Sequence, residues 1–527
     1  MRRVLVLGEI LRRHARVRPE QTAYVIGTAR VTYGQFNDRV NRLAHALRAL
    51  GVRRGERVAV LANNCVQYPL AYFACIKLGA ILVPVNARFK DDEVQYVVAH
   101  AAVVVVLYGP EFGATIRRLR GCWPCVRHYR SLAGRAFRAW LDGYPGHEPL
   151  EFVDEQDPHV MLYTSGTTGR PKGALLSHRA YFLQAAHAHQ VTGLSEDDIG
   201  LSMFPMFHMG GWALPLGFWH DGGTVIIMER ADPRAMLEAV QREHVTYLYA
   251  VPTLYNFMLD LPDFERFDLS SLRVLASGTS VMTQEQIGRI VERFRNPNLF
   301  IIFGSTEAGP VATLRPADLW RKPGSVGRPA LNVELRIVDG HDDELPAGTV
   351  GEIVCRSEFA MRGYWQMPDE TAAALRGGWV HTGDLGVVDE DGFVFIAGRK
   401  KEMIKSGGEN IFPAEVERVL LAHAGIAQAA VLGVPDPDWG ESVLAVVVPR
   451  GGYRLSEAEV IAHVRSRLAG FKKPRYVRFV DALPRTAATR QVQKAVLREQ
   501  FVAASRERRP GQQAARGFAS PAPQTRE

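Results

Sequence analysis

The residues best suited to chemistry lie between 163 and 178, where the chain reads YTSGTTGRPKGALLSH. Short hydroxyl groups donate hydrogen bonds to phosphate, and glycine lets backbone N–H groups approach an anion closely. A flexible Ser/Thr/Gly turn is the alternative, but the Pro-Lys-Gly end is unusual for a linker. An ordinary P-loop fits poorly, because Pro171 stands where that motif has glycine before its lysine. We therefore predict phosphate binding by Thr164, Ser165, Gly166, Thr167, Thr168, Gly169 and Lys172.

The string FGSTEAGP, residues 303 to 310, is a second candidate for phosphate chemistry. Gly304 permits close approach to a ligand, and Ser305 and Thr306 carry hydroxyls that can donate to a phosphate or to adenine. Glu307 offers a carboxylate suited to Mg²⁺, although a single glutamate in a turn is usually a solvated charge. Magnesium together with a lysine would neutralise the negative charge of a bound phosphate. We predict Thr164 and Glu307 as the residues that hold the metal.

Two further side chains stand out by their surroundings. Asp384 lies in the glycine-bounded string GWVHTGDLG, where one carboxylate can accept hydrogen bonds from both hydroxyls of a ribose. His208 follows an apolar run in LSMFPMFHMGG, and a lone histidine in such a place is more often a core residue than a catalyst. Each is therefore a candidate whose role depends on the rest of the pattern.

Strands and helices alternate through the first half of the chain, which predicts a largely parallel sheet covered by helices. The N-terminal part predicts a helix, a short strand pair near residues 23 to 31, and a helix over 35 to 51 with Phe36, Val40 and Leu43 on one face. Strands are then expected at RVAVLA, AILVPVN, VVVVLY, GGTVIIM, TYLYAVP and LRVLASG, and helices at NNCVQYPLAYFACIKLG, KDDEVQYVVAH and HRAYFLQAAHAHQV. Strand ends near Gly278 and Thr279 face the edge where α/β sheets collect ligands.

The strings TSGTTGRPKG, FGSTE, TGDLG and GGEN occur in this order, and together they resemble the AMP-binding, adenylate-forming superfamily, which includes acyl-CoA synthetases and coumarate-CoA ligases. Only residues 109 to 150 and the tail lie outside the resemblance. It implies an α/β fold with a large N-terminal domain of mostly parallel sheets, residues 1–398, and a small mobile α+β lid, residues 399–504. Residues 505–527 are expected to be a disordered tail.

The resemblance also implies roles for single residues. Asp384 and Arg399 would bind the ribose, and His208 would lie at the carboxylate end of the acyl pocket. Lys401 stands at the hinge position. The adenine and nucleotide turns would comprise Gly278, Thr279, Phe303, Gly304, Ser305 and Thr306, although this chain has GTS where the family more often has Gly-Ala-Pro. The tunnel for the pantetheine arm of coenzyme A would be lined by Lys405, Ser406, Gly407, Gly408 and Glu409, and plausible acyl-pocket walls are Phe207, Trp212, Thr279, Phe303 and Val311.

The final motif departs from the family pattern. The family reads close to Pro-Arg-Thr-x-x-Gly-Lys, and its lysine assists adenylation, whereas residues 484 to 494 read PRTAATRQVQK. Gln491 stands at the lysine position and Arg490 at the glycine position. Three explanations remain open: Arg490 supplies the charge, Lys494 supplies it after a small shift, or no cation reaches the phosphate. We favour Arg490, because arginine is always charged and can grip phosphate.

These observations predict an acyl-CoA synthetase that activates a carboxylic acid, expected to be a fatty acid, with Mg-ATP and transfers it to coenzyme A. Three alternatives remain: transfer to a carrier protein, use of the adenylate in a luciferase-type oxidation, and a binding protein without catalysis. The partners expected are the acid, ATP and coenzyme A, with a possible homodimer. The net charge of +8 is spread over scattered arginines, which is not the pattern of a nucleic-acid surface.

Composition predicts a cytoplasmic protein of at least two domains. At 527 residues the chain exceeds the size of one core, and five cysteines are too few for a disulfide framework. The longest apolar run, AAVVVVLYG, falls well short of the roughly 20 residues that cross a bilayer, so no stable membrane insertion is expected. Cys122 and Cys125 form a CWPC string near His128, but no second ligand pair follows, which favours unpaired thiols over a zinc or redox site.

Overall fold

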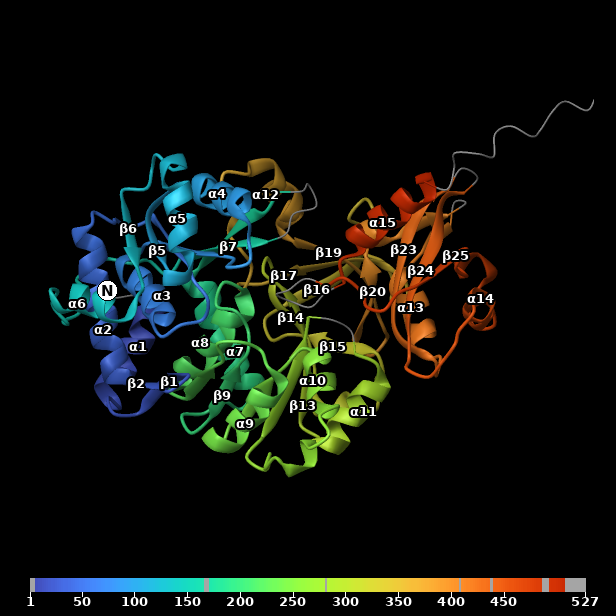
Figure 1. Ribbon diagram of the computed structural model, residues 1–527, viewed down its shortest axis with the longest axis horizontal. Helices are drawn as coiled ribbons and strands as arrows, with labels where there is room; N and C mark the ends of the chain where they lie inside the picture. The colour runs from blue at the N-terminus through green and yellow to red at the C-terminus, as the bar shows by residue number, and fades with distance from the viewer. Residues whose placement is uncertain are drawn as a thin grey trace, which may run out of the picture. The chain divides into compact units, whose positions relative to one another are not determined.

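The computed structural model describes residues 5–164, 170–279, 282–406, 409–436, 439–485 and 492–507. Internal contacts divide the chain into two compact units, Met1–Ile396 and Ala397–Glu527, coloured blue to amber and orange to red in Figure 1. The boundary predicted after residue 398 falls just beyond this division. Most of the predicted tail, residues 508–527, lies outside the described residues.

The N-terminal elements form as their apolar spacing predicts. They are α1 (Leu7–Val17), β1 (Thr22–Ile26), β2 (Ala29–Thr32) and α2 (Tyr33–Ala49). Phe36, Val40 and Leu43 are fully buried along one face of α2. The helix begins at a capping box, because the Thr32 side chain accepts from the Gln35 N–H and the Gln35 side chain accepts from the Thr32 N–H.

A seven-stranded sheet carries the phosphate-binding segment at one end. Its strands run in the order β18-β8-β7-β4-β3-β5-β6, and the five from β7 to β6 are parallel. Their bounds are β3 (Arg57–Leu61), β4 (Ile81–Val85), β5 (Val103–Tyr108), β6 (His128–Ser131), β7 (Pro158–Thr164), β8 (Lys172–Ser177) and β18 (Gly363–Tyr364). The helices between them are α3 (Gln67–Leu78), α4 (Asp91–His100), α5 (Gly113–Leu119) and α6 (Gly134–Asp142), with 3₁₀ turns η1 (Pro110–Phe112) and η2 (Arg120–Cys122).

A thirteen-stranded sheet holds the second phosphate motif and the predicted pocket strands. Its order is β16-β17-β19-β20-β15-β14-β13-β12-β11-β9-β10-β1-β2, and the strands from β13 to β1 are parallel. The bounds are β9 (Ile199–Ser202), β10 (Thr224–Ile227), β11 (Tyr247–Tyr249), β12 (Val274–Gly278), β13 (Leu299–Ser305), β14 (Gly309–Leu314), β15 (Ser325–Pro329), β16 (Glu334–Val338), β17 (Gly351–Arg356), β19 (Val380–Val388) and β20 (Val394–Arg399).

Helices fill and cover these two sheets in layers. Side chains of α1, α2, α3, α7 (His178–Thr192) and α8 (Met209–Asp221) form one core with residues of both sheets. The outer face of the thirteen-stranded sheet packs on α9 (Pro233–Glu243), α10 (Pro252–Leu259) and α11 (Gln284–Arg293), grouped in green in Figure 1. Helices α4 and α5 cover the outer face of the other sheet. The shorter elements are η3 (Phe264–Arg266), η4 (Pro316–Asp318), α12 (Pro368–Ala374) and η5 (Arg376–Gly378).

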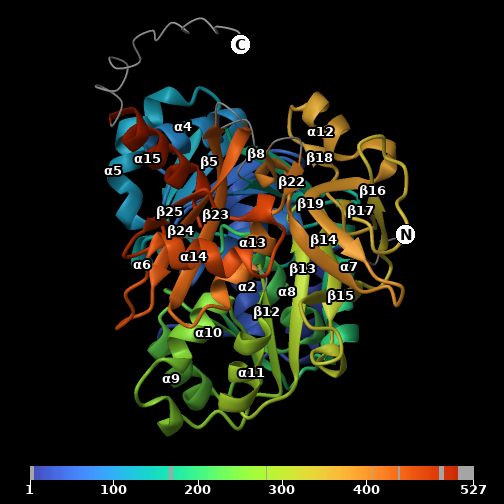
Figure 2. The ribbon, with the colours of Figure 1, turned by 90° about the vertical axis from the view of Figure 1, so that its right-hand side faces the viewer.

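The smaller unit is a five-stranded sheet with helices on both faces. Figure 2 shows its strands β23 (Ile426–Asp436), β24 (Gly440–Pro449) and β25 (Tyr476–Phe479) beside one another. Helices α13 (Pro413–Leu421) and α14 (Glu457–Arg465) pack on one face, and Leu497 of α15 (Lys494–Glu507) packs on the other. The remaining elements are η6 (Lys400–Glu402), β21 (Ile404–Ser406), β22 (Glu409–Ile411) and η7 (Gly470–Lys472). The two units therefore confirm the predicted α/β class.

Residues 109 to 150, which give little sequence signal, form η1, α5, η2, β6 and α6. Their end is fixed by Glu148, whose carboxylate accepts a hydrogen bond from the buried Lys77 ammonium at 2.8 Å. Burial lowers the pKa of Lys77 to about 8, against the opposing effect of Glu148. Cys122 and Cys125 are exposed, and both are free cysteines.

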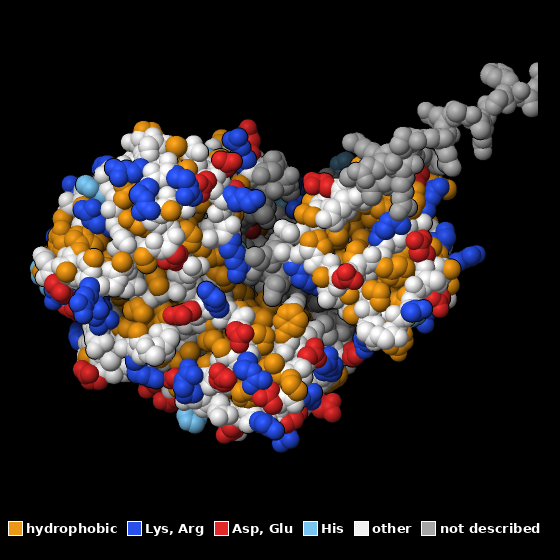
Figure 3. Space-filling model, viewed as in Figure 1, with side chains coloured by type: hydrophobic (Ala, Val, Ile, Leu, Met, Phe, Trp, Pro, Cys, Tyr) orange, Lys and Arg blue, Asp and Glu red, His pale blue; other side chains and the backbone are white. Residues whose placement is uncertain are grey.

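On the face drawn in Figure 3, Lys and Arg are interspersed with Asp and Glu within each unit. Among the helices that the structure describes, none combines the length and apolar character needed to span a bilayer.

Candidate active site

Three neighbouring strands place a hydroxyl, a lysine and a tyrosine on one face of the seven-stranded sheet. Thr164, the last residue of β7, lies opposite Lys172, the first residue of β8. Tyr364 of β18 lies opposite Ala174 of β8. Residues opposite one another share a face, as do residues two apart on one strand, so these side chains point the same way. The predicted phosphate ligands Ser165, Gly166, Thr167, Thr168 and Gly169 connect β7 to β8 but lie outside the described residues.

Glu307 joins this group from the turn after β13. Its Oε1 atom accepts a hydrogen bond from the Thr164 hydroxyl and another from the Tyr364 hydroxyl, each at 3.0 Å. Gly304 keeps the turn tight, because an added Cβ would collide with the carbonyl oxygen of Gly309. The structure therefore brings together Thr164, Lys172 and Glu307, which the sequence placed in two separate motifs, and it adds Tyr364, which the sequence analysis missed.

Lys172 lies beside the same tyrosine. Its ammonium is 5.2 Å from the centroid of the Tyr364 ring, within the range of a cation–π contact. The base of the hairpin is also held from α4, since the Tyr96 hydroxyl donates to the Pro171 carbonyl at 3.2 Å. The Lys172 ammonium therefore lies at the start of β8, next to the segment that joins β7 to β8.

The donor set around Glu307 fits magnesium better than a transition metal. A carboxylate and the neighbouring Thr164 hydroxyl are hard oxygen ligands, which suit Mg²⁺. Among the described residues, no group of three or more His, Cys, Asp or Glu side chains is arranged to hold a metal ion. An ion bound by one carboxylate, one hydroxyl and substrate phosphates is the arrangement that these residues support.

The predicted adenine turn lies at the end of β12. Gly278 is its last residue, and an added Cβ there would collide with the Ile302 carbonyl oxygen and the Tyr249 hydroxyl. Thr279 follows with φ of +71°, a conformation that β-branched residues rarely adopt. Backbone strain of this kind persists where surrounding structure imposes it, often at ligand sites. Phe303, Ser305 and Thr306 lie on the neighbouring strand and turn and are partly exposed.

Two of the residues predicted for the acyl pocket are buried. Trp212 and Val311 are fully buried, and the Trp212 ring stacks on Tyr72 at 3.8 Å between centroids. Their contact with an acid remains a prediction. Tyr249, at the end of β11, is partly exposed and packs edge-on against Phe204 at 5.3 Å. The sequence analysis recognised this strand but not its terminal tyrosine, whose position at a parallel strand end was the available signal.

His208 lies at the start of α8 with its ring against Phe207, 4.8 Å between centroids. Its Nε2 atom is buried and has no hydrogen-bond partner among the described residues. Burial, helped by the charge of Arg88, lowers the pKa of His208 to about 4. The imidazole is therefore neutral at pH 7 and retains unused hydrogen-bonding capacity.

The two predicted ribose contacts, Asp384 and Arg399, lie on strands β19 and β20. Asp384 is a buried residue of β19, and its N–H donates to the Thr382 hydroxyl at 3.1 Å. Arg399 is the last residue of β20 and belongs to the smaller unit. Their joint contact with a ribose remains a prediction.

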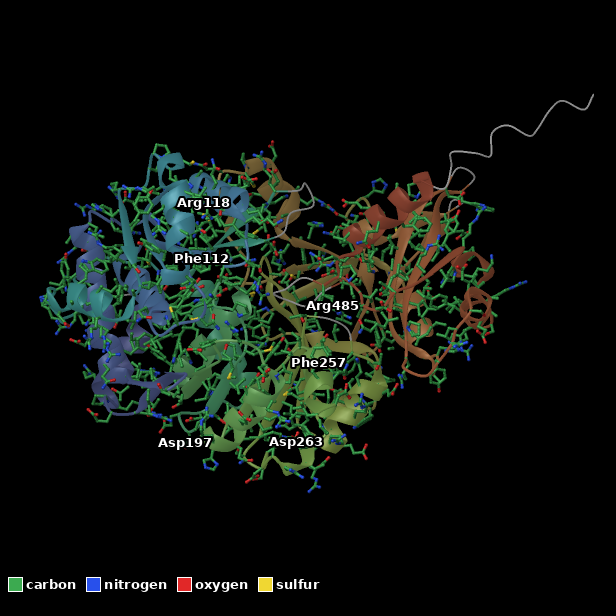
Figure 4. All side chains as sticks on the ribbon, in the orientation of Figure 1. Phe112, Arg118, Asp197, Phe257, Asp263 and Arg485 are labelled. Carbon is green, nitrogen blue, oxygen red and sulfur yellow. The ribbon has the colours of Figure 1, made fainter. Side chains whose placement is uncertain are left out.

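In the smaller unit, Lys401 is exposed in η6, and Lys405, Ser406 and Glu409 lie on the short strands β21 and β22. Gly407 and Gly408 fall outside the described residues. The described ends of the final motif are fixed: Arg485, labelled in Figure 4, forms a β-bridge with Val492 and donates to the Gln428 side chain at 3.0 Å. Arg490 and Gln491 lie between these ends, outside the described residues.

Lys494 is engaged within the smaller unit. Its ammonium is 3.0 Å from a Glu402 oxygen and 2.8 Å from a Glu417 oxygen. Burial acts to lower the pKa of Lys494, but the two carboxylates outweigh it and raise the pKa. In this structure, therefore, Lys494 connects α15 to η6 and α13, and its charge is matched by two carboxylates.

The buried histidine that follows β8 should make the stability of the protein sensitive to acid. His178, the first residue of α7, is fully buried, and burial lowers its pKa to about 4 despite Asp157 and Asp154. As pH falls below about 6.5, the unfolded chain binds a proton that the folded state refuses until about pH 4, so stability is lost across that window. We expect His178→Phe to remove on the order of 2–3 kcal/mol of the fall in unfolding free energy between pH 7 and pH 4.

Denaturant unfolding followed by tryptophan fluorescence at several pH values measures this effect. The exposed His341 provides the control, because His341→Gln should leave the pH dependence unchanged. Parallel pH profiles for His178→Phe and the unmodified protein would show that His178 is not held neutral by burial.

Both units of the chain match models of known protein families. The sequence profile described as AMP-binding enzyme matches residues 11–365, and that of the AMP-binding enzyme C-terminal domain matches residues 415–490. Together these matches cover most of the chain and include every site residue in the larger unit except Asp384.

Similar proteins match most of the chain. A feruloyl-CoA synthase from Amycolatopsis sp is 39% identical over 504 residues, covering 94% of this chain and 99% of that protein. A fatty acid–acyl-carrier-protein ligase, ScoC of Streptomyces coeruleorubidus, is 34% identical and covers 93% and 95%. The crystal structure of the anthranilate CoA ligase AuaEII with anthranoyl-AMP superposes with a TM-score of 0.88 at 31% identity, covering 94% of this chain and 98% of that one.

Proposed function

Because this chain belongs to the AMP-binding enzyme family and is an adenylate-forming acid–thiol ligase, we propose that it joins a planar aromatic carboxylic acid to coenzyme A. In the first step a carboxylate oxygen attacks the α-phosphorus of ATP, the bond to the bridging oxygen breaks, and pyrophosphate leaves. In the second step the thiol of coenzyme A loses its proton, its sulfur bonds to the acyl carbon, and AMP leaves.

The aromatic acid is favoured by the residues at the ends of β11, β12 and β13. The Tyr249 hydroxyl lies where a Cβ on Gly278 would stand, so this aromatic side chain borders the end of β12. Phe303 is partly exposed on the next strand. A flat ring fits between aromatic side chains, whereas a long alkyl chain needs an open channel. The single observation that carries the substrate class is this placement of Tyr249 against Gly278.

The similar proteins support the same choice without deciding it. Feruloyl and anthranoyl groups are aromatic, whereas ScoC is a fatty acid ligase. A fatty acid, which the sequence analysis expected, therefore remains the competing substrate class.

The residues near Glu307 would position the triphosphate. Glu307 and Thr164 would hold Mg²⁺, which when bound neutralises phosphate charge and polarises the phosphoryl oxygens. Lys172 would contribute a second positive charge from the β7–β8 turn, with the hydroxyls and glycines of residues 165 to 169 donating hydrogen bonds. Neutral His208 would face the carboxylate end of the acid, where an N–H can donate without becoming a fixed ion pair.

The remaining predicted residues complete the proposal. Gly278, Thr279 and the turn from Phe303 to Thr306 would surround adenine, and Asp384 with Arg399 would bind the ribose. Lys401 would be the hinge of a lid whose segment 405 to 409 lines the path of the pantetheine arm. Arg490 would supply the cation of the final motif. A cytoplasmic location and a possible homodimer stay predictions.

Acid-dependent exchange of pyrophosphate into ATP tests the proposal. Cinnamic, benzoic and arylacetic acids are compared with straight-chain acids of short, medium and long chain, and we expect kcat/KM at least roughly tenfold higher for the best aromatic acid. A preference for long-chain acids would overturn the aromatic assignment, and no exchange with any acid would favour the non-catalytic binder.

The acceptor is tested separately. Free coenzyme A and a pantetheinylated carrier protein are each supplied with the preferred acid, and the thioester is detected by mass spectrometry. We expect the thioester of free coenzyme A. Transfer to the carrier alone would support the alternative that ScoC represents, and an oxidised product that consumes oxygen would support the luciferase-type reaction.

A further inference from the structure

We propose that Tyr364 is a positioning residue for adenylation, which orients Glu307 through its hydroxyl and holds Lys172 through its ring. The inference rests on the proposed function, because it assigns Tyr364 to the magnesium and triphosphate site. No motif predicted a role for this residue, and it enters the site from a strand of only two residues.

The backbone holds that strand firmly. The N–H of Arg362 donates to the Leu175 carbonyl and the N–H of Trp365 donates to the Gly173 carbonyl, each at 2.8 Å. Tyr364 lies between these two bonds and opposite Ala174 of β8. Its N–H also donates to the Thr371 hydroxyl at 2.9 Å. The ring is therefore fixed relative to the strand that begins at Lys172.

The hydroxyl defines the orientation of the Glu307 carboxylate. Tyr364 and Thr164 both lie on the seven-stranded sheet and both donate to Oε1 of Glu307, and neither donates to Oε2. A carboxylate has only acceptors, so both hydroxyls must be donors. Two donors on one oxygen fix the rotation of the group and leave its other oxygen available for a cation.

The ring of Tyr364 holds the Lys172 side chain in position. A lysine on a flexible stem near a partly exposed carboxylate would otherwise sample many rotamers or pair with that carboxylate. The ring face 5.2 Å from the Lys172 ammonium offers a position that favours the cation without neutralising it. One side chain therefore keeps the site's carboxylate and its lysine apart and in place.

Two variants separate these tasks. Tyr364→Phe keeps the ring and removes the hydroxyl, and Tyr364→Leu removes both. Tyr163→Phe is the matched control, since it removes another partly buried hydroxyl from β7 of the same sheet, one that contacts His100 at 2.7 Å and not Glu307. ATP binding is measured by titration calorimetry over a range of Mg²⁺ concentrations, and pyrophosphate exchange is measured over the same range.

We expect Tyr364→Phe to raise the Mg²⁺ concentration for half-maximal ATP binding and exchange roughly tenfold, with little change in ATP affinity at saturating Mg²⁺. Tyr364→Leu should show the same shift and in addition weaken ATP binding at saturating Mg²⁺ several-fold. Tyr163→Phe should leave the Mg²⁺ dependence unchanged. A tyrosine with a purely structural role would not change the Mg²⁺ dependence in Tyr364→Phe while leaving the ATP affinity at saturating Mg²⁺ unchanged.

Unchanged Mg²⁺ dependence in Tyr364→Phe, or equal shifts in Tyr364→Phe and Tyr163→Phe, would overturn the inference. Failure of the proposed function is a different result: the unmodified protein would then show no acid-dependent exchange, while the calorimetric comparison of ATP and Mg²⁺ binding would still judge Tyr364.

Discussion

Glu307→Gln should lower acid-dependent pyrophosphate exchange by a factor on the order of 100–1000 while leaving the fold intact. The amide oxygen can still accept the hydrogen bonds from the Thr164 and Tyr364 hydroxyls, which now meet at Oε1 at 3.0 Å. What is lost is the negative charge that would hold Mg²⁺ against the triphosphate. Exchange at saturating acid and ATP, followed against Mg²⁺ concentration, measures the loss.

The exposed glutamate Glu358, which pairs with Arg179 at 2.8 Å, supplies the control. Glu358→Gln removes the same charge from the same unit and should leave exchange within about twofold, because exposed ion pairs contribute little. An activity for Glu307→Gln close to that of the control would remove Glu307 from the metal site and leave Lys172 as the candidate for charge neutralisation.

The second large effect concerns the altered final motif. We expect Arg490→Ala to slow exchange about a hundredfold, since it would remove one charge-assisted contact to the α-phosphate. Lys494→Ala should act differently, because Lys494 is 3.0 Å from Glu402 and 2.8 Å from Glu417. Its removal leaves two partly buried carboxylates unmatched and should destabilise the smaller unit by about 1–3 kcal/mol. Exchange rates and thermal unfolding of both variants give the comparison.

Gln491→Lys completes this series, because it restores the residue that the family pattern has at this position. Exchange should be unchanged or faster in this variant. A large loss of rate would show that the alignment of residues 484 to 494 is wrong, and a slow Lys494→Ala with normal thermal stability would return Lys494 to the chemistry.

Local sequence patterns predicted the elements of the larger unit well where apolar spacing was regular. The helix containing Phe36 and the strands around Val58, Leu82 and Val105 form where expected, because burying one face of each element satisfies both propensity and packing. Residues 109 to 150 resisted prediction because their five elements are short and their apolar side chains few.

The sequence predicted only some of the contacts in the candidate site, for a different reason. Motifs identified Thr164 and Glu307, yet the contacts that join them to Tyr364 connect residues 143 and 57 positions apart in the chain. Such pairings depend on strand order and register, which no local pattern encodes. The same limit applies to Trp212 and Val311, because only the packing shows that both side chains are fully buried.

The strand order of the seven-stranded sheet places the strands that carry the phosphate-binding residues and the segment least like the family at opposite edges. β18 and β8, which carry Tyr364 and Lys172, form one margin, and β6, from the segment least like the family, forms the other. Three strands lie between β7 and β6, so the segment from 109 to 150 joins the sheet far from the strands that carry Thr164 and Lys172. Side chains of α2 and α3 hold the end of this segment: Lys77 donates to Glu148, Asn41 donates to the Gly146 carbonyl and Arg42 donates to the Tyr144 carbonyl. Substitutions at this margin should therefore change the stability of the larger unit more than its affinity for a nucleotide.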